Sequence, residues 1–527
     1  MLAGILLVAC TASPPRPPVV RGPEPVRGGV LRVLFAEDVD SLDPHRAGRP
    51  GSWFVARALH RGLMAFPYTQ YPSGARPVPD LAAAEPTMSD DGLVYVFRLR
   101  EDVRFGAPAS RAVTGADVIA SLTRALRAGG DIASGLDVVA GAPAFAAGHT
   151  EHVVGLSVSK LGAVRIRLSR PAADLLSVLA HPQLSIIPAE TPRSGTSNPA
   201  KIAGAGPYRV ASYAPERSLV LERNPAWSAI SDSVRAAYVD RIEARMNVAA
   251  DQAGKLVAAG EADLVADQGP PDAGAPVFPQ GARRVRAASG CVRYLFMNVS
   301  SRPFGSTHVR RGIAALVRRA RITPAEASAA VRILPALVTG HGGAAEIPED
   351  LQGARASLQA AGLTDGFSTT LVVGDSARDR REAGAVRASL ARAGIRVRVK
   401  VVGAGTLHRR YYERDGAAPM GIATWCADFP GLAGAGVLKG VLAYSGDDAA
   451  SNEIRSARAV AGSAAAEAWR VAETAVLRSA VVVPLYWPAD LVGLSNRLSG
   501  YVPAPMWVAG DPANVWVGPQ APAASAS

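Results

Sequence analysis

The chain has 527 residues, of which 48% are hydrophobic and 19% are charged, so it is not an intrinsically disordered protein. Its length predicts two or three packed domains. The formal net charge is +12, but the arginines are scattered and form no recognised nucleic-acid module, so we expect no nucleic-acid partner. No run of about 18 apolar residues follows Cys10, and no transmembrane helix is therefore expected.

Helices and strands are both expected along the whole chain. Alternating apolar and β-branched residues predict strands, and apolar residues at helical spacing predict helices. The expected strands span residues 30–35, 93–100, 164–168, 219–222, 369–373, 395–402 and 480–486. The expected helices span residues 117–127, 308–320, 351–361, 380–393 and 464–478. This interspersed order predicts an α/β fold with mixed sheets, and the strand–helix–strand order over 369–402 predicts a parallel strand pair.

The N-terminus ends a short apolar run with Leu-Val-Ala-Cys at 7–10, and a Pro-rich stretch follows. A run of this kind resembles the lipobox of bacterial lipoproteins, in which the Cys is the first mature residue and carries a diacylglycerol. The resemblance implies a signal peptide over 1–10, a tether over 11–28 and a lipid anchor at Cys10 on the outer face of the cytoplasmic membrane. Residues 1–9 hold no Lys or Arg, so we expect the true start to lie upstream. The alternative is an ordinary N-terminus with an unrelated Cys.

The remaining cysteines form an even pair, Cys291 and Cys426. In an exported protein such a pair is a candidate disulfide. Two buried free thiols are the alternative.

Short motifs recur in a characteristic order. They are Ser-Leu-Asp-Pro-His at 41–45, Pro-Asp-Leu-Ala at 79–82, the segment 89–105, Thr-Gly-Ala-Asp-Val at 114–118, Gly-Ala-Gly-Pro-Tyr at 204–208, Asn-Pro-Ala-Trp at 224–227, Gly-Glu-Ala-Asp-Leu at 260–264, the segment 296–310 and Trp-Cys-Ala-Asp at 425–428. In type and order they resemble family 5 of the bacterial extracellular solute-binding proteins, the peptide-, oligopeptide- and nickel-binding subunits of ABC importers. The resemblance covers about residues 29–515.

The resemblance implies a two-lobed fold like that of large class II periplasmic binding proteins, with an extra domain and a hinge between the lobes. Closure of such lobes removes a solute from water and couples binding to a change of shape. The implied boundaries are 29–75, 185–285 and 480–527 for domain I, 76–184 for domain II and 286–479 for domain III.

Asp428 is the main candidate for ligand recognition. In the family, the Asp of this motif pairs with the α-ammonium of a bound peptide, and Trp425 and Phe429 would form an aromatic wall beside it. Asp428 as a turn cap and Trp425 as a core residue are the alternatives. The oligopeptide-binding pattern also has an Arg where this chain has Ile422, so a ligand carboxylate needs another partner. Relatives with Cys at both positions imply the Cys291–Cys426 disulfide.

Signals for metal binding and catalysis are weak. His45 stands alone, and His149 and His152 read as solvated loop residues, so we expect no metal site. Trp487 is expected to be structural. No hydrolase elbow, phosphate loop, zinc-protease motif or dinucleotide motif is present, so no catalytic residue and no cofactor is expected.

The sequence therefore predicts a monomeric, lipid-anchored receptor. It would bind a small solute, expected to be a short peptide, and deliver it to ABC permease subunits. One alternative is a receptor of the same fold for a metal chelate, a sugar oligomer or a signalling peptide. The other is a secreted α/β hydrolase, which would change its substrate's mass.

Overall fold

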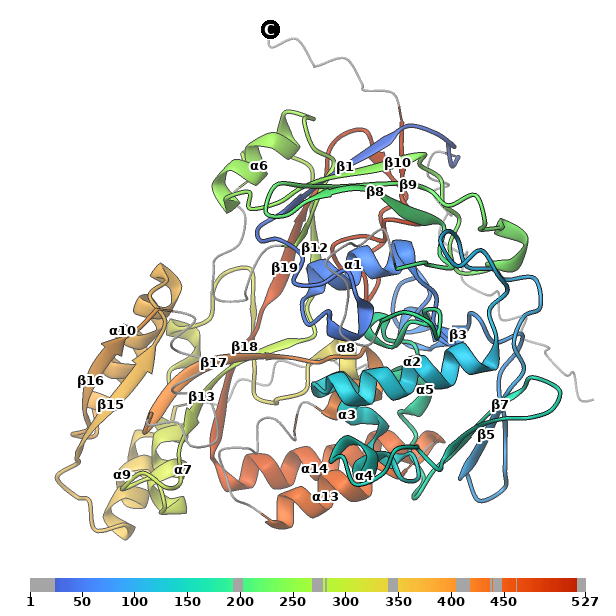
Figure 1. Cartoon of the computed structure of the whole chain (residues 1–527). Helices are drawn as coiled ribbons and strands as arrows, with labels where there is room; N and C mark the ends of the chain where they lie inside the picture. Colours follow the sequence, from blue (N-terminus) through green and yellow to red (C-terminus); the bar gives the residue numbers. More distant parts are fainter. Residues whose placement is uncertain are drawn as a thin grey trace, which may run out of the picture.

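Three larger sheets organise the molecule (Figure 1). The structure is a computed structural model that describes residues 24–192, 202–267, 278–279, 282–339, 349–403, 418–436, 438, 448–460 and 462–518. Within these ranges, no helix combines the length and the apolar character needed to cross a membrane.

The first sheet has five strands in the order β11-β1-β10-β9-β8. They are β1 (Val30–Phe35), β8 (Tyr208–Ala214), β9 (Ser218–Arg223), β10 (Arg241–Arg245) and β11 (Leu264–Asp267). β1 is parallel to β10 and β11, whereas β9 is antiparallel to β10 and β8. Leu31 and Val33 point from β1 into a core shared with Phe54 of α1 (Pro50–Leu59), as the alternation of a half-buried strand requires. The short helix α6 (Ala250–Ala258) packs beside β11.

The second sheet is antiparallel, with four strands in the order β4-β5-β7-β6. They are β4 (Thr87–Met88), β5 (Val94–Phe97), β6 (Leu156–Val158) and β7 (Val164–Arg167). The helices that share its core are α2 (Gly115–Ala128), α3 (Asp131–Ser134), α4 (Ala142–Ala146) and α5 (Leu175–Leu179). α2 begins two residues before the predicted start because Thr114 and Asp117 form a capping box.

The third sheet has six strands in the order β14-β18-β13-β17-β15-β16. They are β13 (Cys291–Met297), β14 (Ser328–Ala329), β15 (Ser368–Val373), β16 (Arg396–Val401), β17 (Met420–Cys426) and β18 (Val482–Trp487). One face packs on α7 (Thr307–Leu316), α9 (Leu351–Ala360) and α10 (Ala377–Ala391). The other packs on α8 (Ala336–Thr339), α13 (Asp448–Arg458) and α14 (Ala465–Ser479). β15 and β16 form the predicted parallel pair.

The helix predicted over 308–320 is shorter in the structure. α7 ends at Leu316, and the backbone becomes extended at Val317. The turn that follows lets the buried Arg319 Nε donate hydrogen bonds to the carbonyl oxygens of Ala330 and Pro484, 3.1 and 2.8 Å away. A continued helix would carry this guanidinium away from both carbonyls, so tertiary hydrogen bonding overrides the local periodicity.

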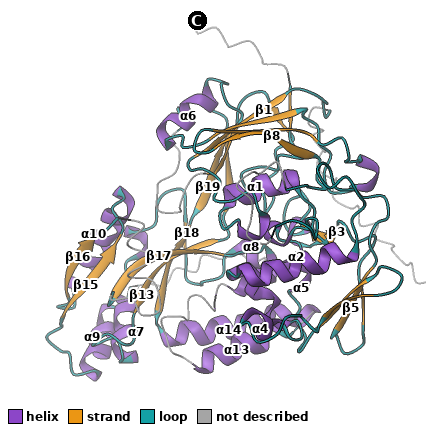
Figure 2. Ribbon diagram, in the orientation of Figure 1, coloured by secondary structure: helices purple, strands orange, loops and turns teal. Residues whose placement is uncertain are grey.

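Two antiparallel strands, β12 (Arg284–Ala288) and β19 (Ala489–Gly493), connect the third sheet to the first (Figure 1). The chain enters the third sheet through β12, which precedes β13, and leaves it through β19, which follows β18. We call the first two sheets with their helices the first lobe, and the third sheet with its helices the second lobe. Figure 2 shows the mixture of helices and strands in both. The residue boundaries given above for domains I to III stay a prediction.

A buried ionic network joins the two sheets of the first lobe. Asp80, which follows the β2–β3 pair (Met64–Ala65 and Val78–Pro79), accepts a hydrogen bond of 2.7 Å from Arg61 Nε and one of 2.8 Å from Arg235 Nη2. Arg235 also contacts Asp232, and all four residues are at most 5% exposed. Burial alone would raise the pKa of Asp232. The positive charges of Arg235 and Arg61 have a larger opposite effect, so the pKa lies well below its ordinary value.

Removing Asp80 is expected to destabilise the first lobe strongly. In Asp80→Ala, Arg61 and Arg235 lose a shared carboxylate while remaining buried, which costs about 3–5 kcal/mol of unfolding free energy. Urea denaturation of wild type and variant measures this change. Glu467→Gln is the control, because its ion pair with Arg470 is exposed and contributes little. Equal losses in both variants would contradict a special role for the network.

Candidate ligand-binding site

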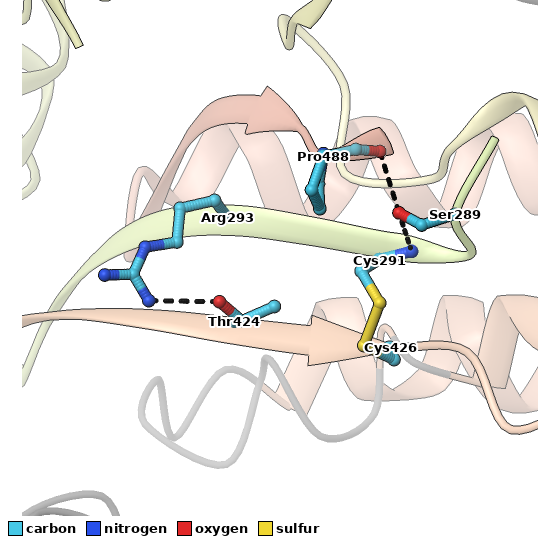
Figure 3. The surroundings of a disulfide bond; sticks show 6 residues. All are labelled: Ser289, Cys291, Arg293, Thr424, Cys426 and Pro488. Carbon is cyan, nitrogen blue, oxygen red and sulfur yellow. Dashed lines mark hydrogen bonds between the residues drawn. A yellow bond between two sulfur atoms is a disulfide. The ribbon is translucent and has the colours of Figure 1, made fainter. Parts of the chain in front are cut away.

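Three strands of the third sheet meet at one edge, where the sequence placed its candidate residues. β17 ends at Cys426 and β18 ends at Trp487, while the antiparallel β13 between them begins at Cys291. Cys291 lies directly opposite Cys426, and their sulfurs form a disulfide (Figure 3). This is the pairing that the family resemblance implied.

Hydrogen bonds tie this edge together across all three strands. Ser289 Oγ donates to the carbonyl of Pro488, 2.8 Å away, and accepts from the backbone N–H of Cys291 at 3.3 Å (Figure 3). Two residues further along β13, Arg293 Nη1 donates to Thr424 Oγ1 at 3.0 Å. The segment after Cys426 therefore leaves a rigid edge, which positions Asp428.

Asp428 is the sharpest chemical feature of this edge. Its side chain is half-buried, and within the part of the chain that the structure describes its carboxylate has neither a hydrogen-bond nor an ion-pair partner. Burial, with a smaller contribution from the charge of Asp131, raises the pKa of Asp428 to about 6. Asp131 begins α3 of the first lobe, so Asp428 faces across the lobes. A desolvated carboxylate without a partner is ready to bind a cation.

Phe429 crosses from the second lobe to the first. Its ring packs against the core of the second sheet and lies edge to face with His181, with 5.6 Å between ring centroids. His181 in turn meets Trp53 edge to face at 4.6 Å. Burial lowers the pKa of His181 to about 3, so this imidazole is neutral at physiological pH. Phe429 thus holds an interlobe contact beside Asp428, a role that its own sequence neighbourhood does not signal.

Trp425 and Trp487 flank Val292 on one face of the third sheet. Trp425 is opposite Val292 in β17, and Trp487 follows Tyr486, the partner of Arg293, in β18. Trp425 is half-buried against the core, whereas Trp487 is 8% exposed and belongs to that core, as predicted. Part of the Trp425 side chain therefore packs in the core, and part of it stays accessible to a solute.

The histidines considered as possible metal ligands lie in structural or solvated positions. His45 is buried, its Nε2 lies 2.9 Å from the carbonyl oxygen of Ser185, and burial lowers its pKa to about 4. His149 and His152 are exposed. Among the described residues, no group of three or more His, Cys, Asp or Glu side chains could hold a metal ion. Cys10 lies outside the described residues.

Sequence reasoning did not find Asp131 and His181. Both belong to the first lobe and are separated from Asp428 by more than two hundred residues, so no local pattern connects them. Only the folded arrangement of the lobes brings them to this edge.

Comparison with known proteins identifies the class. The family model described as "Bacterial extracellular solute-binding proteins, family 5 Middle" matches residues 76–434, more than half of the chain, and the chain belongs to this family. The glutathione-binding protein GsiB of Salmonella typhi is 25% identical over 404 residues, which cover 71% of this chain and 69% of that protein.

Solved structures share the fold. A structure titled "Clavulanic acid biosynthesis oligopeptide binding protein 2" has a TM-score of 0.82 at 25% identity, covering 94% of this chain and 96% of that one. DppA from Helicobacter pylori, solved with the peptide STSA, has a TM-score of 0.72 at 21% identity, covering 93% of this chain and 98% of that one. The predicted α/β two-lobed fold and the predicted solute-binding class are confirmed.

The raised pKa of Asp428 predicts a pH-dependent change in stability. The pKa of an unfolded Asp is about 3.9, so the folded state binds the proton of Asp428 more tightly than the unfolded state does. Protonation of Asp428 therefore stabilises the fold at low pH, and this stabilisation is lost as the pH rises through about 6. Asp428→Asn removes the buried charge. We expect its melting temperature without solute to exceed that of wild type at pH 7.5, and the difference to shrink as the pH falls toward 4.

The melting temperatures are measured by calorimetry, and two further variants serve as controls. Asp131→Asn should lower the pKa of Asp428 and reduce the effect, whereas the exposed Asp375→Asn should change nothing. A lower melting temperature for Asp428→Asn at every pH would mean that the carboxylate is a structural hydrogen-bond acceptor, such as a turn cap.

Proposed function

We propose that the protein is the substrate-binding subunit of an ABC importer and that its solute is a short peptide with a free ammonium group. The solute is held between the lobes and handed, unchanged, to a membrane permease. The observation that carries this proposal is the desolvated Asp428 carboxylate, which has no partner among the described residues. An ammonium would balance its charge through a charge-assisted hydrogen bond.

The surroundings of Asp428 support a peptide amine over a bare cation. Trp425, three residues before Asp428, offers a half-buried aromatic surface, and such surfaces favour the carbon-rich parts of an organic ammonium. The relatives point the same way, because GsiB is named for glutathione and the DppA structure contains the peptide STSA. Phe429 contributes by closing the wall between the lobes.

The first test identifies the solute without assuming its nature. Small molecules released by denaturing the natively exported protein are identified by mass spectrometry. Recovery of short peptides with free amino termini supports the proposal. Recovery of a metal chelate or a sugar oligomer would replace it with a receptor for that solute, and a change of mass on incubation would indicate a hydrolase.

The second test addresses Asp428 directly. Losing one partner of a buried charge pair costs about 2–5 kcal/mol, so Asp428→Asn should weaken binding of a peptide taken from a di- to pentapeptide library by about 30- to 4,000-fold. Calorimetric titration gives the affinity, and Asp375→Asn is the matched exposed control. N-acetylation of the peptide should weaken wild type similarly and the variant little. Equal binding of free and acetylated peptide by wild type would exclude Asp428 as the amine receptor.

We also propose that a diacylglycerol on Cys10 anchors the protein to the outer face of the cytoplasmic membrane, where the permease lies. Two acyl chains hold a protein to a bilayer far more firmly than one. Expressed behind a complete signal sequence, Cys10→Ser should move the protein from the membrane fraction to the soluble fraction. Ser13→Ala, three residues away, should remain in the membrane fraction. Unchanged membrane association of Cys10→Ser, scored by immunoblotting, would contradict the anchor.

A further inference from the structure

A single arginine makes several contacts between the two lobes, away from the connecting strands β12 and β19. Arg458, the last residue of α13 in the second lobe, donates from Nε to Asp174 Oδ2 at 2.7 Å and from Nη1 to Asp137 Oδ1 at 3.0 Å. Its Nη2 donates to the carbonyl of Gly135 at 3.0 Å. All three acceptors belong to the first lobe. The backbone adds one contact, from the N–H of Ala173 to the carbonyl of Arg458 at 3.4 Å.

These groups are removed from water to different degrees. The side chain of Arg458 is 22% exposed, that of Asp174 16% and that of Asp137 37%. Arg170 also pairs with Asp137, so two guanidiniums face two carboxylates. Burial raises the pKa of Asp174 although Arg458 opposes it, so an unpaired Asp174 anion would be costly in this position.

The junction around Arg458 is suited to separating again. It borders a partly open pocket of about 210 Å³, with Asp137, Arg170 and Pro171 on one side and Ser451, Ile454 and Arg455 on the other. A polar, loosely filled junction of this kind loses little packed apolar surface when it opens, unlike a continuous core. In Figures 1 and 2, α13 lies at the lower edge of the molecule and β19 in its upper half. Because this contact lies far from the connecting strands, it opposes rotation of the lobes more effectively than a contact close to those strands would.

We propose that Arg458 is a latch that holds the lobes closed. It is thus a positioning residue for the proposed solute binding, on which the inference rests. A solute that requires closed lobes binds with an affinity reduced by whatever fraction of the protein is open. The latch raises the closed fraction before the solute arrives, and its polar bonds to Asp174 and Asp137 exchange for water when the permease opens the lobes.

The test measures closure in the absence of solute. Dyes on Leu161→Cys in the first lobe and Ala388→Cys in the second, both exposed, report the lobe separation by single-molecule energy transfer in the full chain with Cys10→Ser. In Arg458→Ala we expect the ratio of closed to open molecules to fall about 5- to 150-fold, the usual span of such couplings. Arg455→Ala is the matched control, because this neighbour lines the same pocket but, among the described residues, has a hydrogen bond only to Asn452 of its own helix.

Rescue separates a latch from a general loss of structure. Arg458→Asp combined with Asp174→Arg should restore much of the closed fraction, and Arg458→Lys should restore part of it, since lysine keeps the charge but not the forked geometry. Indistinguishable distance distributions for wild type, Arg458→Ala and Arg455→Ala would overturn the latch. Because no solute is present, the result is independent of whether the solute is a peptide.

Discussion

The buried pairing of Asp80 with Arg61 and Arg235 is the interaction on which the first lobe, and with it one side of the solute site, depends. It joins the first and second sheets through charge-assisted bonds of 2.7 and 2.8 Å in a region closed to water. A second buried pair, Arg57 with Asp511, draws the C-terminal segment into the same lobe. Breaking either pair would leave a buried charge without its partner, so these contacts hold the first lobe together, and the connection to the second lobe runs through β12 and β19.

Two lobes connected by two strands can act as a receptor when a group bound between them favours their contact. In the proposed function, Asp428 supplies such a preference, since its desolvated charge is a cost in the free protein that a cationic group of the solute removes. Phe429 and His181 make the nearby apolar contact. Binding energy from the solute is therefore coupled to lobe position, which is what a transporter reads when it accepts a loaded receptor.

The contacts at the sheet edge that carries Asp428 and the contacts of Arg458 between the lobes have separate tasks. The disulfide and the Ser289 hydrogen bonds stiffen the edge that carries Asp428, so that the carboxylate keeps its position. The Arg458 contacts lie elsewhere and are polar, which allows them to exchange with water. Under the two proposals, Asp428 selects the class of solute, while Asp428 and Arg458 together set the balance between open and closed lobes.

The sequence by itself determined the local elements, the family and the candidate carboxylate. The parallel β15–β16 pair follows from apolar periodicity, and the Trp-Cys-Ala-Asp motif points to Asp428, because both are encoded within a few neighbouring residues. The end of α7 and the partners Asp131 and His181 were decided by tertiary structure. The Arg458 contacts join residues 284 and 321 positions apart. Such pairings leave no pattern in the local sequence, because these contacts stabilise the protein only after folding has excluded water from around them.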